Sequence, residues 1–157
     1  MARDAIRHGG CRCGRLRFRL SSRSLLDSIC HCTGCQRMTG GAFSVTTATA
    51  SDSFEVVSGD PVVGGIHGEQ AHHYHCDWCK SWVFTRLEPD LGFVNVRAAM
   101  LDDPGTFTPF VEMQVAERRP WVHLAVERSY DRFPPMEEYP AIIADFATWR
   151  SGGESGG

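Results

Sequence analysis

Apolar and polar residues alternate along several short stretches of this chain, and the alternation predicts β-strands. Residues 15–20 alternate arginine with leucine and phenylalanine, as expected for a strand with one face in water. Residues 93–97 alternate in the same way, and residues 43–50 are rich in the valine and threonine that strands favour. Shorter strand candidates lie at residues 54–57, 82–85, 111–115 and 122–126.

Two segments carry helical patterns. Near the end of the chain, apolar residues recur at i, i+1, i+4 and i+7 and so share one helix face; they are Ile142, Ile143, Phe146 and Trp149. Pro140 suits the first turn of that helix, where its missing N–H costs nothing. A shorter helical turn is expected after Cys32, ended by Gly40 and Gly41. Many short strands and little helix predict a mainly β fold with a short C-terminal helix.

Length and composition limit the classes of protein to consider. The chain has 157 residues, 42% of them hydrophobic and 22% charged, with a net charge of −3. We expect a single domain over residues 1–150 and a flexible Gly/Ser-rich tail over residues 151–157. The charge gives no sign of a nucleic-acid partner, and no apolar stretch is long enough for a membrane span. The N-terminus has no apolar signal region, so we expect a cytoplasmic protein, where stable disulfides are rare.

The seven cysteines fall into three clusters, and this grouping predicts metal binding. The clusters are a C-x-C pair, Cys11 and Cys13; a C-x-C-x-x-C triplet, Cys30, Cys32 and Cys35; and a C-x-x-C pair, Cys76 and Cys79. Zinc takes about four thiolates in a tetrahedron, and cysteines close in sequence can supply two of them from one loop. Iron also accepts four thiolates, so the sequence leaves the metal open.

Seven sulfur atoms divide naturally into four and three. The two distant pairs, Cys11 with Cys13 and Cys76 with Cys79, would form a closed structural site. The triplet would hold a second metal with three sulfurs, and its fourth position would take water, substrate or a nearby histidine. Three protein ligands and one exchangeable position are typical of a catalytic zinc. The candidate histidines are His72, His73 and His75, although packing or exposure is the simpler interpretation for each.

The same motifs resemble a known family. The segments Gly10-Cys11-Arg12-Cys13-Gly14, Cys30-His31-Cys32-Thr33-Gly34-Cys35-Gln36-Arg37 with Gly40-Gly41-Ala42-Phe43, and Cys76-Asp77-Trp78-Cys79 are similar to those of the glutathione-dependent formaldehyde-activating enzymes, a family that includes centromere protein V-like proteins. The resemblance extends over residues 9–121. It implies a complex fold of several short coiled β-sheets around zinc sites. The sequence departs from the family at Lys80, where a glycine usually follows the last cysteine.

The resemblance also implies a function. It assigns two zinc ions per chain, a structural one to the two pairs and a second one, which can be partly occupied, to a catalytic triplet of Cys30, Cys32 and Cys35. The open position of the second zinc can receive the thiol of glutathione. The expected activity is that of a carbon–sulfur lyase, joining glutathione and formaldehyde as S-hydroxymethylglutathione. Glutathione is an anion, so Arg37 is a candidate carboxylate contact, with Gly40 and Gly41 allowing close backbone approach; Arg37 as an ordinary solvated residue is the alternative.

Two other functions remain open from the sequence. A non-catalytic zinc module could bind glutathione or a protein partner without turnover. A thiol redox sensor could use the triplet and release its metal on mild oxidation. The sequence leaves the thiol substrate and the oligomeric state open.

Overall fold

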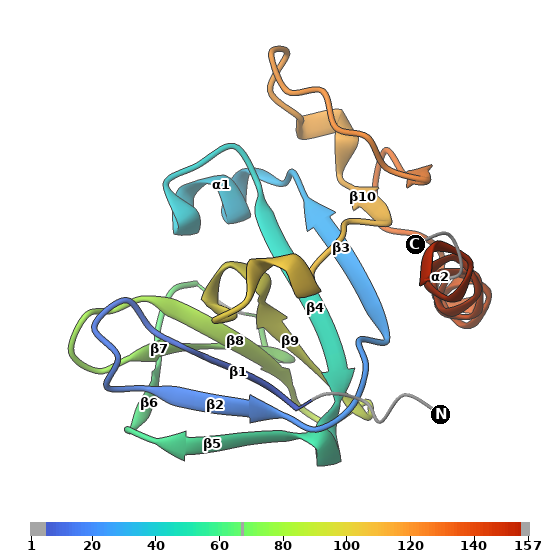
Figure 1. Cartoon of the computed structure of the whole chain (residues 1–157). Coiled ribbons are helices and arrows are strands. Elements are labelled where there is room, and N and C mark those ends of the chain that lie inside the picture. The colour runs from blue at the N-terminus through green and yellow to red at the C-terminus, as the bar shows by residue number, and fades with distance from the viewer. Residues whose placement is uncertain (1–5, 67, 155–157) are drawn as a thin grey trace. The chain divides into compact units, whose positions relative to one another are not determined.

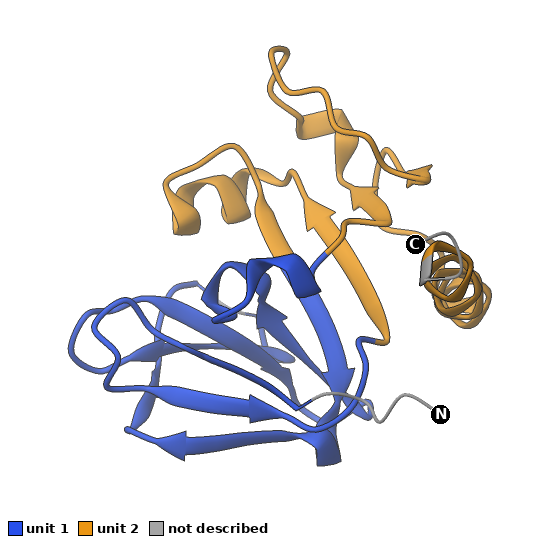
Figure 2. Ribbon diagram, in the orientation of Figure 1, with its two compact units in different colours: residues 1–24, 46–107 blue, residues 25–45, 108–157 orange. Residues whose placement is uncertain are grey.

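The computed structural model describes residues 6–66 and 68–154. The chain forms two compact units, coloured separately in Figure 2. Unit 1 comprises Met1–Ser24 and Thr46–Phe107, and unit 2 comprises Leu25–Val45 and Thr108–Gly157. A single domain over residues 1–150 stays a prediction.

The fold is mainly β, as predicted, and its elements are labelled in Figure 1. The strands are β1 Arg7–Gly10, β2 Arg17–Leu20, β3 Leu26–Cys30, β4 Ser44–Ala50, β5 Phe54–Ser58, β6 Pro61–Val63, β7 Ala71–Cys76, β8 Trp82–Leu87, β9 Phe93–Arg97, β10 Val111–Met113 and β11 Arg128–Ser129. The α-helices are α1 Thr33–Thr39 and α2 Tyr139–Glu154. Short 3₁₀ turns lie at Ser51–Ser53, Ala98–Met100, Pro104–Thr106, Val115–Glu117 and Met136–Glu138.

The strands belong to two sheets. The smaller sheet has the order β1-β2-β5 and lies in unit 1. Unit 1 also contains the strand order β4-β9-β8-β7-β6, in which neighbours are antiparallel and to which β4 adds residues 46–50, and unit 2 contains the order β11-β10-β3, in which neighbours are parallel. The fold class predicted from the sequence is therefore confirmed, including the short helix near the C-terminus.

The alternation in residues 15–20 corresponds to one buried set of side chains in unit 1, as predicted. Leu16, Phe18 and Leu20 are buried, while the arginines between them are half-buried. Phe18 stacks on Phe54 with ring centroids 5.9 Å apart, and Phe54 packs on Phe84 at 4.7 Å. These aromatic contacts join β2 and β5 of the smaller sheet to β8 within the core of unit 1.

The core of unit 2 forms around α2. Ile142 and Phe146 of α2 are 1% and 0% exposed, as the helical spacing predicted. Phe110, just before β10, packs against Phe146 at 5.5 Å and against Trp149 at 5.3 Å. The helix runs on through residues 151–154, where a flexible tail was expected, and residues 155–157 lie outside the described part of the chain.

Two sequence expectations need correction. Residues 122–126 do not form a strand: Val122 is buried, but its N–H bonds to the carbonyl of Arg119 in a turn, and β11 begins only at Arg128. The strand expected over residues 111–115 ends at Met113 because Gln114 takes a left-handed conformation with φ of 57°. That residue turns the chain into the 3₁₀ turn Val115–Glu117.

Candidate metal centres

The two cysteine pairs of unit 1 lie at the turns of two β-hairpins, with Cys76 as the last residue of β7. Residues 11–16 join the antiparallel strands β1 and β2, and residues 77–81 join β7 and β8. Each turn is closed by backbone hydrogen bonds, from Cys11 N to the Leu16 carbonyl and from Cys76 N to the Ser81 carbonyl, both 3.0 Å. The amide of Arg12 reaches Ser81 Oγ across the two turns at 3.3 Å.

This arrangement brings Cys11, Cys13, Cys76 and Cys79 together, with all four sulfur atoms within 4.8 Å of one another. The Sγ atoms of Cys11 and Cys13 are 3.5 Å apart, and those of Cys13 and Cys76 are 3.7 Å apart. These separations are too long for a disulfide. They match the spacing of about 3.8 Å expected between thiolates about 2.3 Å from one tetrahedral zinc. The donor set therefore fits a closed four-sulfur metal site.

The surroundings of these sulfurs favour thiolates at some positions. Burial acts to raise the pKa of Cys79, but hydrogen bonds from Ser81 outweigh it, the hydroxyl lying 3.2 Å away, and the pKa falls to about 5. Burial likewise acts to raise the pKa of Cys11, and the amide of Leu16, 3.3 Å from its sulfur, turns the shift downward. For Cys13, a backbone hydrogen bond lowers the pKa, but burial and the three neighbouring sulfurs raise it to about 11. The surroundings therefore favour the thiolate at Cys11 and Cys79 and the protonated thiol at Cys13.

The triplet lies in unit 2, where β3 passes into α1. Cys30 is the last residue of β3, Cys32 is the N-cap of α1, and Cys35 lies within its first turn. The Cys32 sulfur accepts the Cys35 N–H at 3.3 Å, which satisfies one of the unpaired amides at the start of the helix. As predicted, a glycine stops α1: the helix ends at Thr39, and its C-cap Gly40 has a φ of 67°, which glycine adopts readily.

The three sulfurs of the triplet also lie within 4.8 Å of one another. Among the described residues of unit 2, no histidine, aspartate or glutamate adds a fourth ligand atom to this group. The Cys35 sulfur and burial together raise the pKa of Cys30, and burial raises that of Cys32. All three side chains are partly exposed. The donor set therefore fits a metal with three protein ligands and one further position.

The predicted substrate contacts lie on the other end of α1. Arg37 is exposed in the last turn of the helix, and Gly40 and Gly41 are exposed where it ends. The amide of Gly41 donates to Thr39 Oγ1 at 3.2 Å. The structure thus places all three residues on the surface, Arg37 within α1 and the two glycines directly after it, and their role stays a prediction.

Several neighbours of the triplet carry no sequence motif. Glu112 in β10 and Glu117 in the following turn bind the segment that holds the cysteines, and Tyr139 starts α2. Burial raises the pKa of Tyr139, and the charge of Cys30 adds to the shift. Glu112 and Gln114 alternate with Val111 and Met113, so the pattern alone places them on a solvent face. The one sequence signal that Glu112 is buried is its position between two apolar residues in a short strand.

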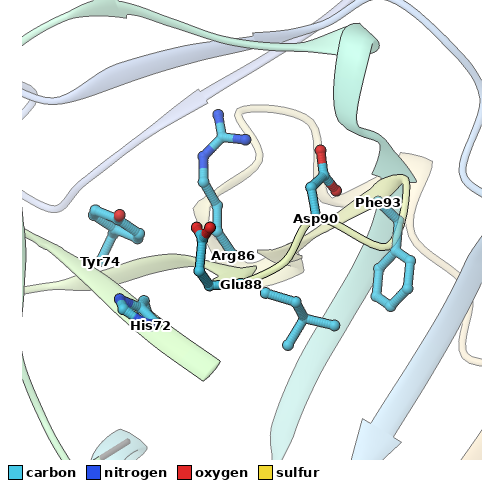
Figure 3. Close-up of a pocket in the computed structure, with 7 residues that line it drawn as sticks. His72, Tyr74, Arg86, Glu88, Asp90 and Phe93 are labelled. Atoms are coloured by element: carbon cyan, nitrogen blue, oxygen red, sulfur yellow. The ribbon is translucent and has the colours of Figure 1, made fainter. Parts of the chain in front are cut away.

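A separate pocket of about 180 Å³ lies in unit 1, and Figure 3 shows residues from β7, β8 and the following turn around it. Its charged groups are Arg86, Glu88 and Asp90. Asp90 accepts hydrogen bonds from Ser51 Oγ at 2.7 Å and from Gly92 N at 2.8 Å, which lower its pKa. Its lining holds two carboxylates and one guanidinium, so the pocket does not suit an anionic ligand such as glutathione. No cysteine lines it.

A comparison with models of known protein families shows which family the chain belongs to. The sequence model of the family named glutathione-dependent formaldehyde-activating enzyme matches residues 6–117, well over half of the chain. The chain belongs to the glutathione-dependent formaldehyde-activating enzyme family. The matched region contains all seven cysteines. The resemblance recognised in the sequence is thereby confirmed.

The comparison with solved structures supports only the fold. A crystal structure of a Rhodobacter sphaeroides protein is similar to this chain, with a TM-score of 0.50 and 19% identity, over 60% of this chain and 87% of that one. None of the curated proteins compared with the chain is detectably similar to it. Neither α-helix of the described residues has the length and apolar character needed to cross a bilayer.

Proposed function

We propose that this member of the glutathione-dependent formaldehyde-activating enzyme family is a zinc-dependent carbon–sulfur lyase or synthase. It joins a small thiol, in the simplest case glutathione, to formaldehyde. The proposal depends on one observation: Cys30, Cys32 and Cys35 gather three sulfurs without a fourth ligand from unit 2. Three protein ligands and an exchangeable position are typical of catalytic zinc, whereas four sulfurs are typical of structural zinc. Family membership supports glutathione and formaldehyde as the substrates.

The two clusters take different roles in this proposal. Cys11, Cys13, Cys76 and Cys79 hold a structural zinc between two hairpins of unit 1, and the triplet holds the second zinc. Zinc bound there supplies stabilisation of the thiolate form of an entering thiol. The protein is proposed to act in the cytoplasm, where its thiols remain reduced.

The reaction itself needs no redox partner. The thiol sulfur forms a bond to the carbonyl carbon, and the thiol proton is transferred to the carbonyl oxygen, giving S-hydroxymethylglutathione. Three thiolate ligands would donate much negative charge to a bound zinc, so the zinc would be only a modest Lewis acid. Binding and orientation of the thiol therefore have to supply much of the rate.

The chain's own contribution to orientation is proposed to come from the end of α1. Arg37 is exposed and carries a guanidinium that can bind a carboxylate of glutathione through two parallel hydrogen bonds. Gly40 and Gly41 have no side chains to block the approach of a peptide-like substrate to the backbone. Arg37→Lys, which keeps the charge and loses the fork, should raise KM for glutathione with little change in kcat.

The direct test follows S-hydroxymethylglutathione formation by NMR exchange spectroscopy, with and without protein. We expect exchange faster than the spontaneous rate for the wild type and the spontaneous rate for Cys32→Ser. Arg119→Ala changes an arginine outside the cysteine segments and serves as the control. A wild-type protein that binds glutathione without accelerating exchange would leave the non-catalytic zinc module as the function.

A further inference from the structure

The segment that carries the triplet is tied to β10 and the turn after it by a set of hydrogen bonds within unit 2. His31 N donates to the Met113 carbonyl at 3.1 Å. Gln36 Nε2 donates to the carbonyls of His31 at 2.7 Å and Glu117 at 3.0 Å. Thr33 Oγ1 donates to Glu117 Oε1 at 2.7 Å. Both ends of the cysteine segment are therefore fixed to one neighbouring stretch of chain.

The side chain of His31, between Cys30 and Cys32, makes a further contact that is fully buried. Its side chain is 0% exposed, and its Nε2 lies 2.7 Å from Oε2 of Glu112, whose side chain is 3% exposed. The ring also meets Phe43 edge-on, with centroids 5.7 Å apart. The position and orientation of the imidazole are thus set by one hydrogen bond and one aromatic contact.

Glu112 is in turn held by its second oxygen. Ser129 Oγ donates to Oε1 at 2.7 Å, and Arg118 Nη1 donates to the same atom at 3.2 Å. A carboxylate that accepts three hydrogen bonds in a buried site cannot rotate without leaving a donor unpaired. The carboxylate is therefore a fixed acceptor for His31.

The alternation of an extended chain links this contact to the metal ligands. Cys30 ends β3, and Cys32 has the extended dihedral angles φ −59° and ψ 150°. In an extended segment, side chains on either side of a residue point away from that residue's own side chain. Holding His31 inward on Glu112 therefore turns the sulfurs of Cys30 and Cys32 to the same, opposite side.

We propose that His31, anchored by Glu112, is a positioning residue for metal binding by the triplet. Its contact fixes the backbone so that Cys30 and Cys32 present their sulfurs together with Cys35 before the metal arrives. Metal affinity at this site then depends on a hydrogen bond made on the side of the chain away from the metal. The inference rests on the proposed function only in taking the triplet as a metal site.

The test measures metal binding without substrate. Zn²⁺ affinities come from competition with a chromophoric chelator, and Co²⁺ titration reports the ligand geometry through its absorption bands. We expect His31→Leu to bind the second metal about tenfold or more weakly, with altered Co²⁺ bands, and to bind the first metal as the wild type does. His31→Gln should restore much of the affinity, because its amide nitrogen can donate to Glu112 in place of Nε2.

Coupling between the two residues is tested by a third and a fourth variant. Glu112→Gln should weaken the second metal to a similar extent, and the double variant His31→Leu/Glu112→Gln should bind no more weakly than His31→Leu alone. Additive losses would contradict a role for His31 through Glu112. If His31→Leu does not fold, His31→Gln and Glu112→Gln are compared, and equal affinity in these two variants would overturn the proposal.

A matched control separates positioning from loss of stability. Ile142→Val removes one buried methyl group from the core of unit 2, in α2, and should leave both metal affinities at the wild-type value. A His31→Leu protein with wild-type affinity and wild-type Co²⁺ bands would overturn the inference alone. A wild-type protein that binds only one metal would instead overturn the proposed function, and the inference with it.

Discussion

Lys80 follows the last cysteine and adopts a φ of 59°, in the left-handed region that favours glycine. Its amide bonds to the Cys76 carbonyl at 3.0 Å, so the turn that places Cys79 requires this conformation. A side chain there costs about 1 to 2 kcal/mol, partly offset because glycine loses more chain entropy on folding. We predict that Lys80→Gly raises the free energy of unfolding by about 0.5 to 1 kcal/mol, measured by urea denaturation.

Lys80→Ala is the control for this prediction. It removes the exposed contact with Asp77 but keeps a side chain in the left-handed conformation. It should therefore leave stability close to the wild-type value. Equal stability of the glycine and alanine variants would show that backbone strain at this position is negligible.

Arg17 and Asp102 form a two-bond ion pair on unit 1, with Nη1 and Oδ1 2.9 Å apart. Hydrogen bonding by Arg17 holds the pKa of Asp102 below its usual value. The folded carboxyl thus binds protons less readily than the unfolded one. Its contribution to stability is present above the unfolded pKa of about 3.9 and is lost as pH falls through the lower folded value.

We therefore predict that Asp102→Asn lowers the free energy of unfolding at pH 7 by less than about 1 kcal/mol, because both side chains are partly exposed. The difference from the wild type should shrink towards zero below about pH 3. Chemical denaturation of metal-free protein at pH 7, 5 and 3 measures it. Asp60→Asn, at an exposed position, is the control; a constant difference at all three pH values would contradict the prediction.

At the scale of elements, the hairpins and the strand–helix junction determine where the cysteines lie. The β1–β2 and β7–β8 hairpins each supply two sulfurs, and the β3–α1 junction supplies three. The alternating strand β2 and helix α2 could be predicted because each has one buried face with a regular period. Strand β3 could not, since Leu26, Asp27 and Ile29 are all buried and leave no alternation.

The helix α2 is predicted to hold the core of unit 2 together. Phe146 is fully buried against Phe110, so Phe146→Ala leaves a cavity and should cost about 3 to 5 kcal/mol of stability. Near-UV circular dichroism during urea denaturation measures the loss. Thr148→Ala, on the exposed side of the same helix, should change stability by less than about 0.5 kcal/mol. Similar losses in both variants would contradict this packing.

At the scale of the whole molecule, the two cysteine groups should differ in what their loss does. Cys32→Ser removes one ligand from the triplet, and we predict that metal content falls from about two to about one while the fold is kept. Cys76→Ser removes a buried ligand from the four-sulfur group that joins two hairpins, and should lower the melting temperature markedly. Metal analysis after desalting, together with thermal unfolding, measures both. Unfolding of Cys32→Ser would contradict a dispensable second site.

The sequence by itself determined which cysteines belong to one cluster. Cysteine spacing within each cluster is a local property, because a short turn holds two sulfurs close whatever the rest of the chain does. The family, the mainly β fold and the division of sulfurs into four and three could therefore be predicted, while the ligand roles remain predictions. The tertiary structure decided what surrounds these sulfurs. Glu112 lies 81 residues beyond His31 and looks like a solvent-facing strand residue. Only the pairing of β10 with β3 buries it beside the triplet, because strand pairing across such a distance depends on the packing of the whole unit.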